Sequence, residues 1–362
     1  MDPIFQTLQS QQSLMEDYLK TLVEMESPSH DKEALDEVAE WLSQTFKDLT
    51  GGTTTIIPDN QYGNHVRCEF GQGDSQLLIL SHFDTVWPKG TLERMPFKKE
   101  NGIAYGPGVF DMKSGLIQGL FALKALKDAG IELDKKVVFF FDSDEEIGNP
   151  SSRTYIEEEA KKSDAVFVLE PALSDEGSLK TSRKGVAIYD IEVNGISAHA
   201  GIAPEEGSSA ITELAYQTLF LNSLNDYEQG TTFNVGKVSG GTANNVVAEK
   251  SQATLDVRAK TKSEFDRVIP IIQNLKPHFK GTEVITRGGV NRFPLERDDR
   301  VLELFQTAQE IGKTRLNIEL TEKETGGGSD GNLTAPLAPT LDGLGQWVAG
   351  HTQSTNKLYW RR

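Results

Sequence analysis

Cysteine is nearly absent from this chain of 362 residues, since Cys68 is its single cysteine. One thiol cannot form a disulfide within the chain, nor can it build a metal cluster from thiolate ligands. Any metal site formed by this chain must therefore use histidine, aspartate or glutamate. An unpaired cysteine also fits a reducing compartment, and we expect a cytoplasmic protein.

Long hydrophobic runs and surplus positive charge are missing as well. No stretch approaches the roughly 18 apolar residues of a membrane span, and the opening MDPIFQTLQSQQ lacks the basic and apolar regions of a secretory signal. The chain has 37 Lys and Arg against 54 Asp and Glu, a formal net charge of −17. Since no excess of basic side chains is left to neutralise phosphates, we do not expect nucleic acid as a partner. The lack of a long apolar stretch leads us to expect no membrane partner either.

The alternation of apolar segments predicts two domains. Short apolar runs at residues 77–80, 137–141 and 165–169 alternate with helical segments at 114–129 and 152–161, which is typical of an α/β layer with a mostly parallel sheet. Two helices broken at Ser27-Pro28 precede this layer. From 183 the order becomes β-α-β-β-α-β, as in a ferredoxin-like unit, and the α/β pattern resumes with a helix at 301–311. We predict a domain at 183–288 inserted into a catalytic domain formed by 1–182 and 289–362.

The chain has only six histidines, and one of them follows a predicted buried strand directly. His82 comes after the run LLILS, at the carboxyl end of that strand, where ligands of parallel sheets bind. Asp84 points to the same side and can accept the ring N–H of a metal-binding imidazole. By itself this His-x-Asp pair is more typical of a surface turn.

Four carboxylates are predicted at the same edge of the sheet: Asp111, Glu145, Glu146 and Glu170. Taken separately, DSDEE is typical of a solvated acidic loop and Asp111 of a helix N-cap. Together they repel one another, and divalent cations relieve that repulsion; oxygen and imidazole ligands suit zinc, manganese or cobalt. Asp111 could bridge two ions and a spare glutamate could activate water, so the pattern indicates a two-metal hydrolase.

A series of motifs then identifies a family: SHFDTV, AYGPGVFDMKSG, FDSDEEIG, VLEP, SAHAG and GGGSDGN. In this order, from Leu14 to Gly345, the chain resembles the zinc-dependent carboxypeptidase G, aminoacylase and succinyl-diaminopimelate desuccinylase family. The run TVWPKGTL places it nearest the glutamate carboxypeptidase branch. The resemblance implies a zinc-peptidase-like α/β catalytic domain, an inserted lid and dimerisation domain, and a homodimer.

The resemblance also implies two Zn²⁺ ions per chain, with Co²⁺ or Mn²⁺ as possible substitutes. His82 and Glu170 would bind one ion, Asp111 would bridge both, and Glu146 would bind the second together with a C-terminal histidine, His351.

Three further residues would act in catalysis by the same resemblance. Glu145 would be the general base and acid, and Asp84 would orient the metal-binding imidazole. His199 of SAHAG would reach across a dimer and stabilise the oxyanion in the partner's site. Outside these motifs, a histidine at this position is more typical of a cap or a core.

Substrate residues are implied at four positions. Asn245 of GGTANNVV matches a family asparagine near the substrate, and Arg258 and Arg287 match positions that bind substrate carboxylate in the glutamate-specific branch. Singly, each arginine is more typical of a surface ion pair. The glycine loop around Gly327 could bind a carboxylate through backbone N–H groups, but it lacks the lysine of a phosphate loop.

The C-terminus departs from the family pattern. The family continues after GLG with a glycine-rich turn, an Ala-His pair and a closing helix, whereas this chain has GLGQWVAGHTQSTNKLYWRR. One back-translation of residues 345–355, read in another frame, gives Ala-Val-Gly-Gly-Gly-Ala-His-Ser-Val-Asn, the expected ending. We therefore predict a frameshift near Gly345, which puts the second metal site in question.

The sequence thus predicts a di-zinc metallohydrolase that cleaves an amide next to a carboxylate and releases C-terminal glutamate from a small peptide or N-acyl amino acid. One alternative is an aminoacylase or deacylase of N-acyl amino acids, or a dipeptidase of the same family. Another is a non-catalytic binding protein, if the altered tail disables the second metal site.

Overall fold

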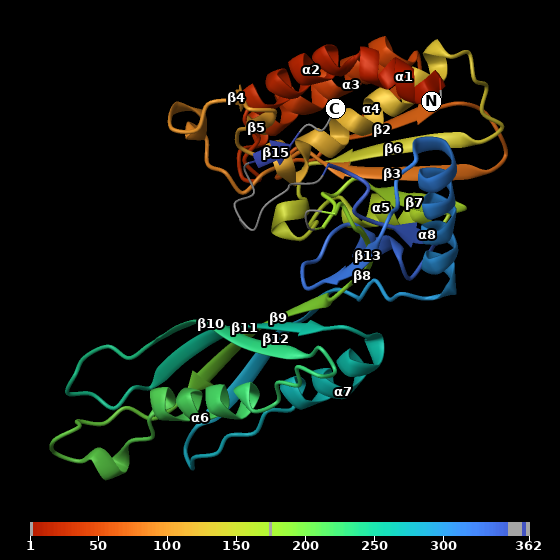
Figure 1. Ribbon diagram of the computed structural model, residues 1–362. Helices are drawn as coiled ribbons and strands as arrows, with labels where there is room; N and C mark the ends of the chain where they lie inside the picture. Colours follow the sequence, from red (N-terminus) through yellow and green to blue (C-terminus); the bar gives the residue numbers. More distant parts are fainter. Residues whose placement is uncertain (1–2, 174–175, 347–356, 360–362) are drawn as a thin grey trace. The chain divides into compact units, whose positions relative to one another are not determined.

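The computed structural model describes residues 3–173, 176–346 and 357–359, and the chain forms two compact units (Figure 1). Unit 1 comprises Met1–Thr181, Arg297–Thr325 and Ser329–Arg362, and unit 2 comprises Ser182–Glu296 and Gly326–Gly328. The domain boundary expected at residue 288 falls inside a strand of unit 2, β12 (Glu283–Arg292). The contacts therefore end unit 2 at Glu296.

A six-stranded, mostly parallel sheet forms the centre of unit 1, as the sequence predicts. Its strand order is β1-β2-β6-β3-β7-β14, in which β2 pairs antiparallel with both of its neighbours and the other three pairings are parallel. The strands are β1 (Thr53–Ile57), β2 (His65–Phe70), β3 (Gln76–His82), β6 (Lys136–Asp142), β7 (Ala165–Val168) and β14 (Thr340–Leu341).

Helices cover both faces of this sheet, which explains the continuous apolar runs of its strands. In β3, Leu78 and Leu80 pack with Phe140 toward α5, whereas Ile79 packs with Phe139 toward α3 and α4. Figure 1 shows helices α1–α4 on one face and α5 and α8 on the other. The helices are α1 (Pro3–Ser10), α2 (Gln12–Glu24), α3 (Lys32–Thr50), α4 (Ser114–Asp128), α5 (Arg153–Ala160), α8 (Asp299–Ile311) and α9 (Gly331–Thr334).

The break predicted at Ser27-Pro28 is present, because α2 ends at Glu24 and α3 begins at Lys32. Asp31 caps α3 by accepting a hydrogen bond from the backbone N–H of Ala34 at 3.1 Å. The intervening segment runs beside the end of β3, where Pro28 forms a parallel bridge with Thr85. The break thus brings residues 27–31 next to the edge where His82 lies.

Unit 2 has the chain order β-α-β-β-α-β that the sequence predicts. Its antiparallel sheet has the order β10-β11-β9-β12, and α6 and α7 pack on one face through a separate apolar core. In β11, Leu255 and Val257 are buried in this core, while Asp256 and Arg258 alternate onto the other face. The elements not yet given are β9 (Gly185–Asn194), α6 (Ala210–Asn222), β10 (Thr232–Gly240), β11 (Lys250–Ala259) and α7 (Lys262–Gln273).

Short strands complete the sheets of the described residues. They are β4 (Lys98–Glu100), β5 (Ile103–Tyr105), β8 (Leu179–Arg183), β13 (Glu322–Thr325) and β15 (Lys357–Tyr359). β15 pairs antiparallel with β5, and β13 pairs with β8. Among the helices that the structure describes, none combines the length and apolar character needed to cross a membrane.

Candidate metal centre

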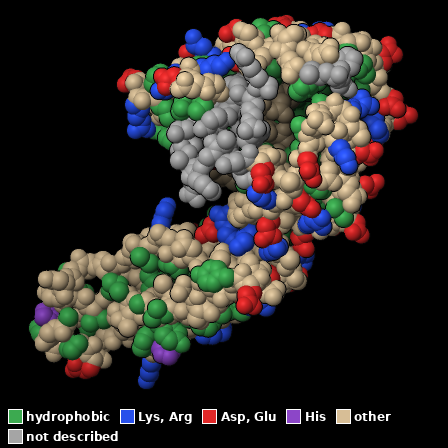
Figure 2. Space-filling model, viewed as in Figure 1, with side chains coloured by type: hydrophobic (Ala, Val, Ile, Leu, Met, Phe, Trp, Pro, Cys, Tyr) green, Lys and Arg blue, Asp and Glu red, His purple; other side chains and the backbone are tan. Residues whose placement is uncertain are grey.

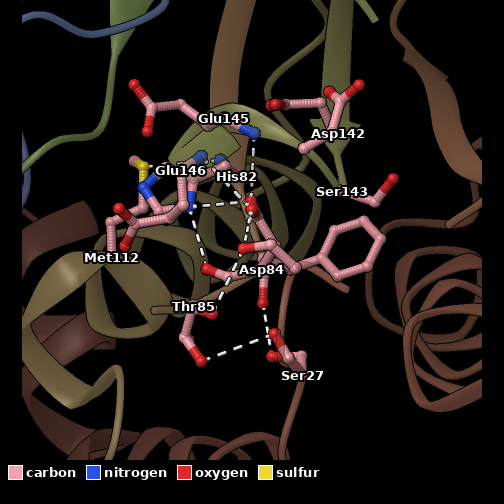
Figure 3. Close-up of polar contacts among 12 residues, drawn as sticks. Ser27, His82, Asp84, Thr85, Met112, Asp142, Ser143, Glu145 and Glu146 are labelled. Carbon is pink, nitrogen blue, oxygen red and sulfur yellow. Dashed lines mark hydrogen bonds and ion pairs between the residues drawn. The ribbon is translucent and has the colours of Figure 1, made fainter. Parts of the chain in front are cut away.

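Three neighbouring parallel strands, β6, β3 and β7, end at the edge of the unit 1 sheet where predicted ligands lie. Figure 3 shows three of the predicted site residues there, His82, Glu145 and Glu146. His82 is the last residue of β3, and its side chain is buried. Glu145 and Glu146 follow β6, and Glu170 follows β7. Since parallel strands end at a common edge, residues far apart in the sequence meet there, as the sequence predicts.

The ligand atoms lie within a few ångströms of one another. His82 Nε2 is 3.3 Å from Asp111 Oδ1 and 3.6 Å from Glu170 Oε1. One ligand atom each from His82, Asp111 and Glu146 can be chosen so that all three lie within 4.8 Å of one another. His82 Nε2 and Asp111 Oδ1 are buried and make no hydrogen bond with the described residues. Because buried polar atoms normally have partners, this donor set fits a bound metal ion.

Asp84 lies behind the cluster, wholly buried. Its Oδ1 is 3.3 Å from His82 Nδ1, on the ring side opposite the candidate metal position. The backbone N–H groups of Glu145 and Glu146 donate to its two carboxylate oxygens at 3.2 Å each (Figure 3). One carboxylate thus orients the imidazole and also positions the loop that carries both glutamates.

Ser29 is a member of the site that the sequence did not indicate. Its hydroxyl donates to Asp84 Oδ2 at 2.7 Å, and both side chains are buried. The two residues are 55 positions apart, so no local periodicity joins them. The only sequence signal is the helix break at Ser27-Pro28, which marks this segment as one that leaves the helical layer.

The electrostatics of the cluster favour a cation. Burial alone would lower the pKa of His82, but the carboxylates of Asp111, Asp84 and Glu170 raise it well above its usual value. Burial, together with the neighbouring charges of Asp111 and Glu145, raises the pKa of Glu146 to about 9. The site therefore concentrates more negative charge than its surroundings stabilise, and a divalent ion would offset it.

Two buried lysines also border the cluster, and the sequence did not single them out. Lys180 Nζ is 3.5 Å from Glu170 Oε2. Lys113, next to the turn that carries Asp111, donates to the backbone carbonyl of Leu22 at 2.9 Å. Burial lowers the pKa of Lys113 to about 7.

The backbone and the side chain of Glu145 face different ways. Its backbone N–H faces Asp84, whereas its carboxylate points away from Asp84 (Figure 3). The side chain is half-buried. A carboxylate with this partial exposure can exchange protons with water.

In unit 2, the predicted residues His199 and Asn245 lie on adjacent segments. His199 forms an antiparallel bridge with Val246, and the carbonyl of Asn245 accepts a hydrogen bond from Ala200 N at 2.9 Å. The side chains of both predicted residues are exposed. The structure thus brings these two candidates together at the surface of unit 2.

The two predicted arginines are not brought together. Both lie on the helix-free face of the unit 2 sheet, where Arg258 binds Asp256 through two contacts of 2.8 Å and Arg287 binds Glu192 at 2.8 Å. Arg258 pairs with Val186 of β9 and Arg287 with Asp190, on opposite sides of that strand. The two arginines are offset by four residues along the strand direction and by two strand spacings across the sheet. Their Cα atoms are therefore about 16 Å apart.

The last two predicted residues are Gly327 and His351. The carbonyls of Gly327 and Gly328 accept hydrogen bonds from the buried Arg183 at 3.1 and 2.8 Å, which positions the glycine loop. His351 and residues 347–356 around it lie outside the described residues.

Comparison with known proteins agrees with this geometry. Residues 78–357 match the model of peptidase family M20/M25/M40. The chain is 30% identical over 355 residues to carboxypeptidase G2 of Pseudomonas sp. (strain RS-16), covering 94% of this chain and 84% of the relative. It is 27% identical over 266 residues to succinyl-diaminopimelate desuccinylase of Ehrlichia canis (strain Jake), covering 68% of each protein.

A solved structure shares the fold over nearly the whole length. The M20 family metallo-carboxypeptidase Sso-CP2 of Sulfolobus solfataricus superposes with a TM-score of 0.71 at 19% identity, covering 99% of this chain and 95% of that one. The family match spans most of the chain and includes the strands that carry the candidate ligands. The protein is therefore a member of the M20/M25/M40 family of metallopeptidases.

Proposed function

We propose that this M20 metallopeptidase is a di-zinc carboxypeptidase that releases glutamate from the carboxyl end of small peptides or N-acyl amino acids. The observation that supports a metal-dependent hydrolase is the cluster of His82, Asp111 and Glu146. Its ligand atoms meet, and they include two buried atoms that form no hydrogen bond with any residue the structure describes. In this proposal His82 and Glu170 bind one zinc ion, and Asp111 bridges to the second. Glu146 binds that second ion together with His351.

Bound zinc would polarise the scissile carbonyl and lower the pKa of the attacking water. Glu145 takes the proton from that water and returns it to the leaving amine. Asp84 keeps the His82 ring in the tautomer whose Nε2 lone pair faces the cluster. Its backbone carbonyl, 3.1 Å from Nδ1, accepts the Nδ1–H, and its carboxylate lies 3.3 Å from the same nitrogen. In the proposed homodimer, His199 of each subunit reaches into its partner's site and donates to the oxyanion that develops there.

The preference for glutamate is supported by the relative named carboxypeptidase G2 and by the basic groups of unit 2. The Cα atoms of Arg258 and Arg287 are about 16 Å apart, and each side chain already pairs with its own acidic residue. We therefore propose that the two arginines do not bind the same substrate carboxylate. Asn245 and the N–H groups of the glycine loop at Gly327 add hydrogen-bond donors for the carboxylate.

The relative named succinyl-diaminopimelate desuccinylase favours a second candidate, a deacylase of N-acyl amino acids. Comparison of substrates separates the two. The zinc-loaded protein should hydrolyse N-acyl-glutamates faster than the same acyl group on lysine or alanine. A deacylase with no preference for the amino acid would contradict glutamate specificity.

Replacement of the proposed base tests the mechanism. Glu145→Gln should lower kcat by about 10²–10⁴-fold while the zinc content stays equal to that of the unsubstituted protein, since the carboxamide cannot accept the proton. Lys99→Gln, a change of an exposed residue of β4, serves as the control. Unchanged hydrolysis by Glu145→Gln would remove Glu145 from the role of base.

We also propose a homodimer formed through unit 2. Hydrophobic side chains lie on the visible surface of this unit (Figure 2). Separately, Ile211, Tyr216 and Leu219 are exposed hydrophobic residues of α6. Strand β10 is at an edge of its sheet, and most of its side chains are exposed. Exposed apolar helices and open strand edges are features of protein interfaces. Sedimentation equilibrium should give twice the chain mass, and Leu219→Glu should shift it to the monomer.

A further inference from the structure

A histidine outside the metal cluster, His65, lies against the loop that carries Glu145 and Glu146. His65 is the first residue of β2, and its side chain is buried. The antiparallel pairing of β2 with β6 begins at Val66 and Phe141, close to the point where β6 ends and the loop starts. Beyond this pair, the ring of His65 reaches the loop.

Each ring nitrogen of His65 contacts one end of the loop. Nδ1 accepts a hydrogen bond from the backbone N–H of Ser143 at 3.3 Å. Nε2 is 2.9 Å from Ser151 Oγ, and that hydroxyl donates to Asp144 Oδ2 at 2.7 Å. Because the hydroxyl proton of Ser151 is already used, Nε2 carries the ring proton and donates to Ser151. The neutral ring is therefore an acceptor at one end of the loop and a donor at the other.

The surroundings of His65 keep the ring neutral and fixed in place. Burial lowers the pKa of His65, and the charge of Lys32 adds a little to this effect. The carboxylates of Asp144, Asp59 and Asp84 act in the opposite direction without cancelling it. The centroids of aromatic rings from β6 and α5 lie 6.1 and 6.2 Å from that of the imidazole. A ring packed in this way has little freedom to turn away from the loop.

The loop is thus held from two directions. On the side of the metal cluster, Asp84 accepts the backbone N–H groups of Glu145 and Glu146. From β2, His65 holds the residues before and after this pair. The placement of both glutamate side chains therefore depends on the imidazole ring. A displacement of about 1 Å at a reacting group can lower a rate about 100-fold.

We propose that His65 is a positioning residue, which keeps residues 143–151 in the conformation that presents Glu145 to the attacking water and Glu146 to the metal. The inference rests on the proposed function, in which Glu145 is the base and Glu146 a zinc ligand. The alternative is a histidine that only stabilises the fold. The two differ in what a substitution does to kcat when the loss of stability is the same.

Substitutions of His65 test this with the zinc-loaded full chain and an N-acyl-L-glutamate as substrate. His65→Leu removes both ring contacts and should lower kcat about tenfold or more, with KM within about twofold. His65→Asn has an amide oxygen that can replace Nδ1 as the acceptor for Ser143 N, so it should retain kcat within about threefold. Zinc content and melting temperature are measured for every variant.

Val138→Ala is the matched control, because Val138 is fully buried in β6 and packs in the core toward α5. It should lower the melting temperature without lowering kcat. A loss of kcat in His65→Leu no larger than in Val138→Ala, or no recovery in His65→Asn, overturns the positioning role. If His65→Leu does not fold, Ser151→Ala takes its place, since it removes one ring contact at a partly exposed residue. Its kcat should then fall about threefold, and an unchanged kcat overturns the role.

Hydrogen exchange separates failure of this inference from failure of the proposed function. If the unsubstituted protein hydrolyses no N-acyl-glutamate, the glutamate carboxypeptidase proposal is wrong. Amide exchange in residues 143–152 and zinc affinity then decide the role of His65. Faster exchange together with weaker zinc binding in His65→Leu, both reversed in His65→Asn, supports the role. If either quantity is unchanged in His65→Leu, the role is overturned.

Discussion

The hydrogen bond from Ser29 to Asp84 should control zinc affinity although neither side chain is proposed to bind the metal. Ser29→Ala removes a donor 2.7 Å from Asp84 Oδ2 and leaves the other contacts of that carboxylate in place. Asp84 keeps the backbone N–H groups of Glu145 and Glu146 and the ring of His82. The substitution therefore weakens the support of the imidazole without removing it.

The size of the effect follows from burial. Asp84 is fully buried and Ser29 nearly so, so the substitution removes a hydrogen bond to a buried charged group. A hydrogen bond to a charged group contributes about 1.5–3 kcal/mol. Since Asp84 retains its other donors, we take the lower end of that range, which corresponds to about tenfold weaker zinc binding.

Competition with a chromogenic chelator measures zinc affinity directly. Ser10→Ala is a matched control, because Ser10 is exposed and its hydroxyl binds only the carbonyl of Thr7 within the described chain. Urea unfolding of the metal-free proteins shows whether Ser29→Ala also destabilises the fold. A zinc affinity within twofold of wild type, in a variant that folds normally, would refute the proposed role of Ser29.

Three further predictions address stability and the tail. Burial alone would raise the pKa of Glu159, but its hydrogen bonds, above all from Arg67, lower it to about 2. This pair should stabilise the fold above pH 4.5 by about 2 kcal/mol and lose that contribution as the pH falls toward 2. Urea unfolding should therefore show a lower free energy of unfolding for Glu159→Gln than for wild type, and this difference should disappear in acid. Phe139→Ala empties a fully buried site in the sheet and should cost about 3–5 kcal/mol, against less than about 0.5 for the exposed Tyr227→Ala. If the frameshift near Gly345 is real, gene sequencing will show codons that permit the alternative frame, and restoring it should raise bound zinc to two ions per chain by elemental analysis; codons that exclude that frame would rule the idea out.

Much of the fold and the core of the candidate site could be predicted from local sequence. Apolar runs such as 137–141 predict strands buried on both faces, and the structure shows Phe139 and Phe140 facing opposite helical layers. His82 follows such a run directly, so its place at the carboxyl edge of a parallel sheet follows from the local sequence. These features depend on residues close together in the chain, where periodicity is informative.

Contacts between distant segments were decided only by the tertiary structure. The sequence shows Ser29 and Asp84 55 positions apart, and only the path of the chain after α2 brings the hydroxyl to the carboxylate. It also shows Arg258 and Arg287 as two equivalent candidates, whereas the strand register separates them and gives each an acidic partner. A pocket beside Glu146 likewise lies between two distant segments, 28–31 and 85–89, which approach each other where Ser27 and Ser29 form backbone hydrogen bonds with Thr85. Periodicity records which face of an element is buried, but which elements meet depends on packing and hydrogen bonds across the whole chain.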